Sequence, residues 1–115
     1  MTITIYHNPK CSTSRNVLGL LRDAGHEPHI VEYLRTPPSR SELKRIVKRM
    51  GAKMSDIFRW KEPLASELGL DPDKSSEDEL LDAMMEHPIL INRPIVVTDD
   101  AVRLCRPSET VKELL

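Results

Sequence analysis

Hydrophobic positions in the first third of the chain change from a two-residue period to a helical period and back. Residues 2–6 alternate isoleucine with polar residues, which predicts a strand. From residue 12 the apolar positions recur at helical spacing until Gly25, a residue type that commonly ends helices. Residues 28–34 are typical of a second strand. Two strands joined by one helix of this length predict a βαβ unit with parallel strands.

The middle of the chain is predicted to be helical. Ser39 and the glutamate three residues later form a capping box at the start of an amphipathic helix, which Gly51 ends. Residues 54–70 indicate one or two short helices. Ser76 and a second glutamate at the same spacing suggest another capping box, and Pro88 ends the helix that follows.

The last part of the chain predicts a hairpin and a final helix. Residues 94–98 form a strand pattern, residues 99–100 a turn, and residues 101–105 a return strand. Pro107 fits the first turn of a last helix. The order βαβ, helical insertion, ββα predicts an α/β protein with a thioredoxin-like fold and a helical insertion between its two halves.

Composition narrows the class of protein. A chain of 115 residues is expected to form one domain, residues 1–115. Charged residues make up 30% of it but leave a net charge of -1, which argues against a nucleic-acid-binding surface that relies on bulk positive charge. We see no secretion signal and no apolar run near the ~20 residues of a membrane helix. With only two cysteines, we expect a reduced, cytoplasmic protein. Nothing in the sequence points to an assembly, so a monomer is the default expectation.

Cys11 is the first candidate for chemistry. It follows a predicted loop at residues 7–10 and precedes the first helix, where free backbone N–H groups and the helix dipole stabilise a thiolate. Lys10 and Arg15 would add positive charge, and Ser14 could donate a hydrogen bond to the sulfur. Because the thiolate is the nucleophile, this position suits covalent catalysis. A buried, inert thiol is the alternative, and the polar, turn-forming surroundings disfavour it.

The spacing after Cys11 is Cys-x-x-Ser rather than Cys-x-x-Cys. Any disulfide of Cys11 must therefore involve another molecule or Cys105, which lies in a predicted strand and reads as structural. His7, four residues before Cys11, could tune the thiolate or be solvated. The remaining histidines have no metal-ligand spacing with the cysteines, so we expect no metal site.

Three arginines are the second group of candidate functional residues. Arg93 and Arg106 each precede a proline, at the entrance to one hairpin strand and just after the other. They could reach the sheet edge that carries Cys11, where guanidinium groups would hold a tetrahedral oxyanion through paired hydrogen bonds. From spacing alone, an ordinary surface position is equally good for these two arginines, and it is favoured for Arg59 in the insertion.

Several segments resemble a known family. The loop around Cys11 closely resembles the nucleophile loop of the glutaredoxin-coupled arsenate reductases, the ArsC family. The resemblance spans almost the whole chain, and the segments that carry it are Tyr6–Asn16, Tyr33–Arg40, Glu62–Leu70, His87–Val97 and Arg103–Ser108.

This resemblance implies a thioredoxin-like fold and a reaction. It implies that Cys11 attacks arsenate, and that three arginines bind and stabilise the oxyanion: Arg59, Arg93 and Arg106. It also implies that His7 and Ser14 favour the thiolate. We expect no bound cofactor in this protein. Family members use glutathione as a co-substrate that attacks the arsenic adduct, and glutaredoxin as the partner that resolves the mixed disulfide.

Two alternatives stay open. Spx-like regulators share the scaffold but bind RNA polymerase, and they typically carry Cys-x-x-Cys as a redox switch. Ser14 and the Arg106-Pro107-Ser108 segment favour the enzyme over such a regulator. A related thiol oxidoreductase with another substrate is the second alternative, and the sequence does not separate it from an arsenate reductase.

Overall fold

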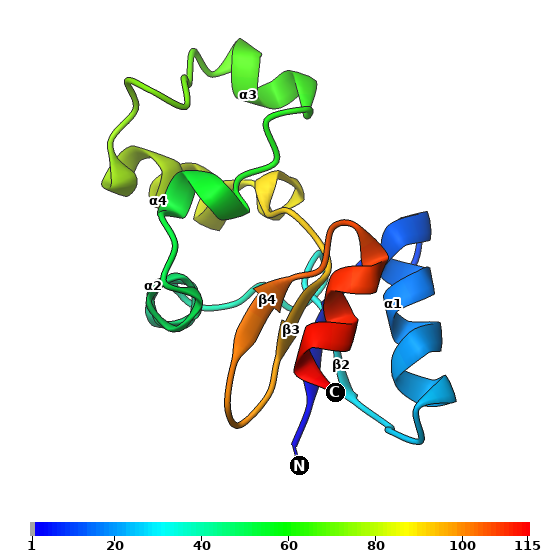
Figure 1. The fold of residues 1–115 in the computed structure, drawn as a ribbon. Coiled ribbons are helices and arrows are strands. Elements are labelled where there is room, and N and C mark those ends of the chain that lie inside the picture. Colours follow the sequence, from blue (N-terminus) through cyan, green and yellow to red (C-terminus); the bar gives the residue numbers. More distant parts are fainter. Residues whose placement is uncertain (1) are drawn as a thin grey trace. The chain divides into compact units, whose positions relative to one another are not determined.

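The computed structural model describes residues 2–115. The chain divides into two compact units. The first unit contains the residues up to Thr36 together with Arg93–Leu115, and the second contains Pro37–Asn92. The elements of each are labelled in Figure 1. The prediction that residues 1–115 form a single domain stays a prediction.

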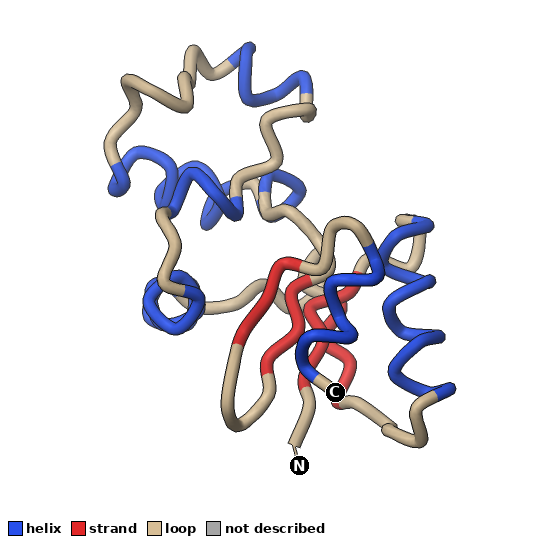
Figure 2. Tube along the Cα trace, in the orientation of Figure 1, coloured by secondary structure: helices blue, strands red, loops and turns tan. Residues whose placement is uncertain are grey.

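The first unit is built on a four-stranded sheet, drawn in red in Figure 2. Its strands lie in the order β2-β1-β3-β4, with the bounds β1 Thr4–His7, β2 His29–Glu32, β3 Ile95–Val97 and β4 Val102–Leu104. Strands β1 and β2 are parallel, whereas β3 is antiparallel to both β1 and β4. This topology confirms the predicted βαβ unit and hairpin, and with them the thioredoxin-like α/β class.

Two helices cover one face of this sheet. Helix α1 spans Ser12–Asp23, and a 3-10 helix, η3, spans Ser108–Leu114. Figure 1 shows both on the same side of the strands. Side chains in a strand alternate between the two faces of the sheet, so every second strand residue points toward these helices. The apolar residues of the helices and those strand residues form one core. The buried members of this core are Ile3, Ile5, Val17, Leu21, Val96, Cys105 and Val111.

The last helix differs from the prediction. It is wound as a 3-10 helix, and Pro107 precedes it as the N-cap instead of occupying its first turn. In a 3-10 helix, residues three apart lie on the same side. Val111 and Leu114 therefore both face the core of the first unit. The tighter winding lets a short segment pack two apolar side chains against the core, with Val111 buried and Leu114 partly buried.

The second unit contains the predicted helical insertion. Its helices are α2 Arg40–Met50, η1 Met54–Ile57, α3 Pro63–Glu67, α4 Glu77–Glu86 and η2 Pro88–Leu90. Ser39 and Ser76 each accept a hydrogen bond from the backbone of a glutamate three residues on, so both predicted capping boxes are present. Gly51 ends α2 with φ 66°, a backbone angle that favours glycine.

Element boundaries depart slightly from the sequence prediction. His7 was expected in a loop but is the last residue of β1, because it pairs with Glu32 in the ladder and its side chain is buried. Within residues 2–115, no helix is long and apolar enough to cross a membrane.

Candidate active site

Cys11 lies where the sequence places it, between β1 and α1. It is the N-cap of α1, with extended backbone angles, and its carbonyl accepts the first helical hydrogen bond from Arg15 at 3.0 Å. The loop before it is closed by a hydrogen bond of 3.0 Å from the N–H of Cys11 to the carbonyl of Asn8. The sulfur is therefore carried at the end of the helix where backbone N–H groups are free.

The surroundings of Cys11 lower the pKa of its thiol. Burial on its own would raise this pKa, but the backbone N–H of Ser14 and the guanidinium groups of Arg93 and Arg106 outweigh that effect. Nη1 of Arg106 lies 3.8 Å from the sulfur. A thiol lowered in this way carries more thiolate at neutral pH, which is the form that attacks electrophiles.

Arg93 and Arg106 meet because of the hairpin. Arg93 lies just before β3 and Arg106 just after β4. In an antiparallel pair, the start of the first strand and the end of the second lie at the same end of the sheet. Nη1 of Arg106 also donates to the carbonyl oxygen of Arg93 at 2.9 Å, which holds the guanidinium beside the thiol. The structure thus confirms that both arginines reach the edge of Cys11. Together with the helix N–H groups, they could hold a tetrahedral oxyanion against the sulfur.

The two cations nearest to Cys11 in sequence, Arg15 and Lys10, lie on the exposed side of the loop. The guanidinium of Arg15 donates to the carbonyl of Pro9 at 2.9 Å, on the exposed side of the loop. Lys10 is exposed. The positive charge predicted around Cys11 from Lys10 and Arg15 comes instead from Arg93 and Arg106.

His7 and Ser14 form a buried pair beneath the loop. Nδ1 of His7 lies 2.6 Å from Oγ of Ser14, and that oxygen also accepts a hydrogen bond of 3.1 Å from the N–H of Asn8. Burial lowers the pKa of His7, against the opposing charge of Glu32, so the ring is neutral near pH 7. The hydroxyl of Ser14 thus fixes the loop, while the backbone N–H of the same residue acts on the sulfur.

Asn8 is a structural residue of the site that the sequence prediction missed. It is buried, and its side-chain Oδ1 accepts from the N–H of Lys10 at 3.0 Å. With the bonds to Cys11 and Ser14 described above, Asn8 ties three points of the loop together. Its Asn-Pro pair predicted a turn, and the turn geometry was the available signal for this role.

Cys105 has the opposite environment. It is fully buried in the core of the first unit, and its thiol contacts the carbonyl oxygen of Arg103 at 3.8 Å. Burial raises the pKa of this thiol to about 12. Such a thiol is protonated at neutral pH, which supports a structural role over that of a resolving thiol.

Arg59 lies in the second unit. Its Nη1 donates to Oδ1 of Asn92 at 3.2 Å, and its Nε pairs with Oε2 of Glu62 at 3.3 Å. The backbone N–H donates to the carbonyl of Leu90 at 2.7 Å. These contacts hold the guanidinium within its own unit, and its predicted part in oxyanion binding stays a prediction.

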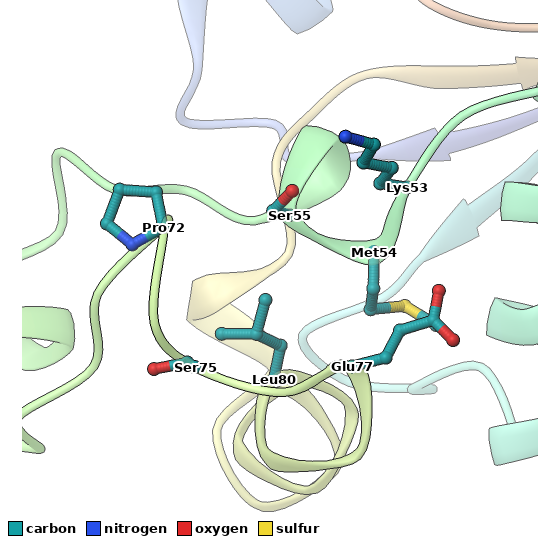
Figure 3. Close-up of a pocket in the computed structure, with 7 residues that line it drawn as sticks. All are labelled: Lys53, Met54, Ser55, Pro72, Ser75, Glu77 and Leu80. Carbon is teal, nitrogen blue, oxygen red and sulfur yellow. The ribbon is translucent and has the colours of Figure 1, made fainter.

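Not every cavity of the protein carries predicted site residues. One of about 260 Å³ lies in the second unit, between the start of η1 and the segment that leads into α4 (Figure 3). Its lining residues are Lys53, Met54, Ser55, Pro72, Ser75, Glu77 and Leu80. Within residues 2–115, no group of three or more His, Cys, Asp or Glu side chains is placed to hold a metal ion.

Known proteins resemble this chain over its full length. A sequence model described as the ArsC family matches residues 6–114. An arsenate reductase of Rhizobium meliloti (strain 1021) is 55% identical over 115 residues, which are 100% of this chain and 82% of that protein. An arsenate reductase of Escherichia coli (strain K12) is 54% identical over 113 residues, covering 98% of this chain and 80% of the relative. The structure of an arsenate reductase from Vibrio cholerae superposes with a TM-score of 0.94 at 47% identity, covering 100% of this chain and 98% of the other.

Proposed function

The chain belongs to the ArsC family, and on that premise we propose that it is an arsenate reductase with Cys11 as its nucleophile. The observation that carries the proposal is the meeting of Arg106 and the Cys11 sulfur, 3.8 Å apart, at the first turn of α1. A stabilised thiolate beside fixed guanidinium groups suits attack on an oxyanion. The two relatives described above, both named arsenate reductases, support arsenate as that oxyanion.

The reaction needs two electrons from thiols. The Cys11 sulfur bonds to arsenic, and one arsenate oxygen leaves as water. The sulfur of glutathione then attacks the Cys11 sulfur. An S–S bond forms and the S–As bond breaks, with its electron pair passing to arsenic. Arsenic falls from As(V) to As(III) and leaves as arsenite, and Cys11 is left in a mixed disulfide with glutathione.

Glutaredoxin completes the cycle in this proposal. Its thiolate attacks the glutathione sulfur and frees Cys11 as a thiolate. The buried, protonated Cys105 is consistent with an external thiol in this role. We place the protein in the cytoplasm, where glutathione and glutaredoxin keep thiols reduced.

The arginines have distinct parts in the proposal. Arg93 and Arg106 neutralise the charge of arsenate and of the departing arsenite beside the sulfur. Arg59 supplies a third guanidinium, as the family resemblance implies. No step requires a resident metal or bound cofactor, because thiols provide both electrons.

The test is arsenate-dependent oxidation of NADPH with glutathione, glutathione reductase and glutaredoxin supplied. The wild type should turn over, Cys11→Ser should be inactive with its fold intact, and Cys105→Ser should retain most of the activity. A folded wild type without activity would contradict the proposed reduction of arsenate. An inactive but folded Cys105→Ser variant would instead contradict glutathione as the resolving thiol.

A further inference from the structure

A groove lies at the carboxyl ends of the parallel strands β1 and β2. Its volume is about 400 Å³, within the ~300–1,000 Å³ range of small-molecule sites. It is lined by the last residues of these strands and by the loops that follow them. The lining residues all belong to the first unit: His7, Asn8, Pro9, Lys10, Glu32, Leu34 and Arg35.

The loops on both sides of the groove are held by hydrogen bonds. On the β1 side, the N–H of Lys10 donates to Oδ1 of Asn8 at 3.0 Å. On the β2 side, the N–H groups of Arg35 and Thr36 both donate to the carbonyl of Glu32 at 2.9 Å. His7 and Glu32 are the last register pair of the two strands and form the base of the groove. The charged side chains therefore project from ordered backbone.

The charges of the groove follow a simple pattern. Lys10 and Arg35 provide two exposed cations, Glu32 provides one exposed carboxylate, and Leu34 adds an apolar side chain that is 41% exposed. Glutathione carries the complementary set at neutral pH, namely two carboxylates and one ammonium group on a short, partly apolar backbone. The β1-side loop also runs directly into Cys11, one residue after Lys10.

We propose that this groove binds glutathione, with Lys10 and Arg35 holding its two carboxylates and Glu32 its ammonium group. The inference rests on the proposed arsenate reduction and names where its co-substrate binds. In this proposal the groove holds glutathione beside the loop that leads to Cys11, and the sulfur of glutathione reaches Cys11 from there. The step is the one written above: the S–S bond forms, the S–As bond breaks, and the electron pair passes to arsenic.

The first experiment measures binding without turnover. S-methylglutathione keeps both carboxylates and the ammonium group but has no free thiol, and its affinity for the protein is measured by titration calorimetry. Arg35→Ala and Lys10→Ala should each weaken binding about fivefold, and the double variant roughly twentyfold. Arg45→Ala removes an exposed arginine of α2 in the second unit and is the matched control, expected to bind like the wild type.

The second experiment compares two thiols in arsenate turnover. Glutathione has carboxylates for the groove, whereas 2-mercaptoethanol has none. The ratio of kcat/KM for glutathione to that for 2-mercaptoethanol should fall about fivefold in Arg35→Ala, chiefly through the KM for glutathione, and should not change in Arg45→Ala. A simple loss of fold or of Cys11 reactivity would lower both values together and leave the ratio unchanged.

The two experiments fail in different ways. If the wild type turns over arsenate but neither S-methylglutathione affinity nor the thiol ratio depends on Arg35, the groove is not the glutathione site, although the proposed function stands. If S-methylglutathione binds and loses affinity in Arg35→Ala while no arsenate is reduced, the groove assignment holds and the proposed function is wrong.

Discussion

The two cysteines of the first unit lie after β1 and directly after β4, and their surroundings shift the pKa values of the two thiols in opposite directions. Cys11 is partly exposed at a helix N-terminus, and two guanidinium groups and a backbone N–H lower the pKa of its thiol. Cys105 is sealed in an apolar core, where burial raises the pKa to about 12. Cys105 is the more deeply buried of the two, and the charge of Glu113 adds to the rise of its pKa, whereas the partners of Cys11 favour the thiolate.

The comparison shows how one fold can shift the pKa values of two thiols in opposite directions. The edge of the sheet gathers loops, a helix terminus and arginines, whereas the face of the sheet gathers aliphatic side chains. Whether the thiolate of a cysteine in this unit is stabilised depends on which of these two regions contains the cysteine.

Alkylation should separate the two thiols most strongly. With its pKa at about 12, Cys105 in the folded protein is thiolate in only about one molecule in 10⁵ at pH 7. Cys11 should therefore react with iodoacetamide faster by orders of magnitude, as followed by peptide mass spectrometry. Both cysteines should label at similar rates in denaturant, which is the control. Comparable labelling of the folded protein at Cys105 would contradict the burial described above.

Removing Arg106 should make Cys11 more like an ordinary thiol. Arg106→Ala loses a charged contact with the sulfur, a kind of interaction worth roughly 1.5–3 kcal/mol. We expect kcat/KM for arsenate to fall about 10-fold to 100-fold, and the pH midpoint of Cys11 alkylation to move upward. Arg103→Ala is the matched control, because that arginine pairs with Glu113 on the surface. An unchanged alkylation midpoint in Arg106→Ala would count against the assigned role of the guanidinium.

Ser14→Ala tests the buried pair beneath the loop. The variant keeps the backbone N–H that acts on Cys11 but leaves Nδ1 of His7 and the N–H of Asn8 without their shared partner. We expect a loss of about 1–3 kcal/mol in the free energy of unfolding, measured with urea. Ser12→Ala, at an exposed position of the same helix, should cost much less. Equal effects in the two variants would mean that the Ser14 hydroxyl does not organise the loop.

The smallest predicted effect is a pH dependence of stability. The pKa of Cys105 is raised in the folded state, so its stabilising contribution is complete below the unfolded value of ~8.5 and is lost as pH rises above it. The wild type should lose about 1 kcal/mol more than Cys105→Ala between pH 8 and 9.5. Cys11, with a lowered pKa, acts with the opposite sign: its contribution is present above the unfolded value and is lost as pH falls through the folded one. Parallel stability curves for wild type and Cys105→Ala would contradict a raised pKa at Cys105.

Much of the fold could be predicted because it depends on local patterns. The alternation in β1, the helical period of α1 and the capping boxes at Ser39 and Ser76 are written in neighbouring residues. The winding of the last helix was not predictable, because it depends on Val111 and Leu114 both facing a core made by distant segments.

The candidate site also has features that local sequence predicts and features that depend on distant segments. The position of Cys11 at a strand-to-helix junction follows from local sequence, and so does the expectation that its thiolate is stabilised. The identity of the cations that surround Cys11 does not follow from local sequence. Arg106 lies 95 residues away along the chain, whereas Lys10 and Arg15 are close to Cys11 in sequence. The orientation of the Ser14 hydroxyl toward His7 rather than the sulfur is likewise a matter of packing, and no spacing rule predicts it.

The most direct measurement is peptide mass spectrometry of the protein after arsenate and glutathione are added without glutaredoxin. If Cys11 is the nucleophile and glutathione the resolving thiol, a glutathione disulfide should accumulate on the Cys11 peptide, and only when arsenate is present. A disulfide between Cys11 and Cys105, a glutathione adduct on Cys105, or an adduct that forms equally without arsenate would contradict the proposed chemistry.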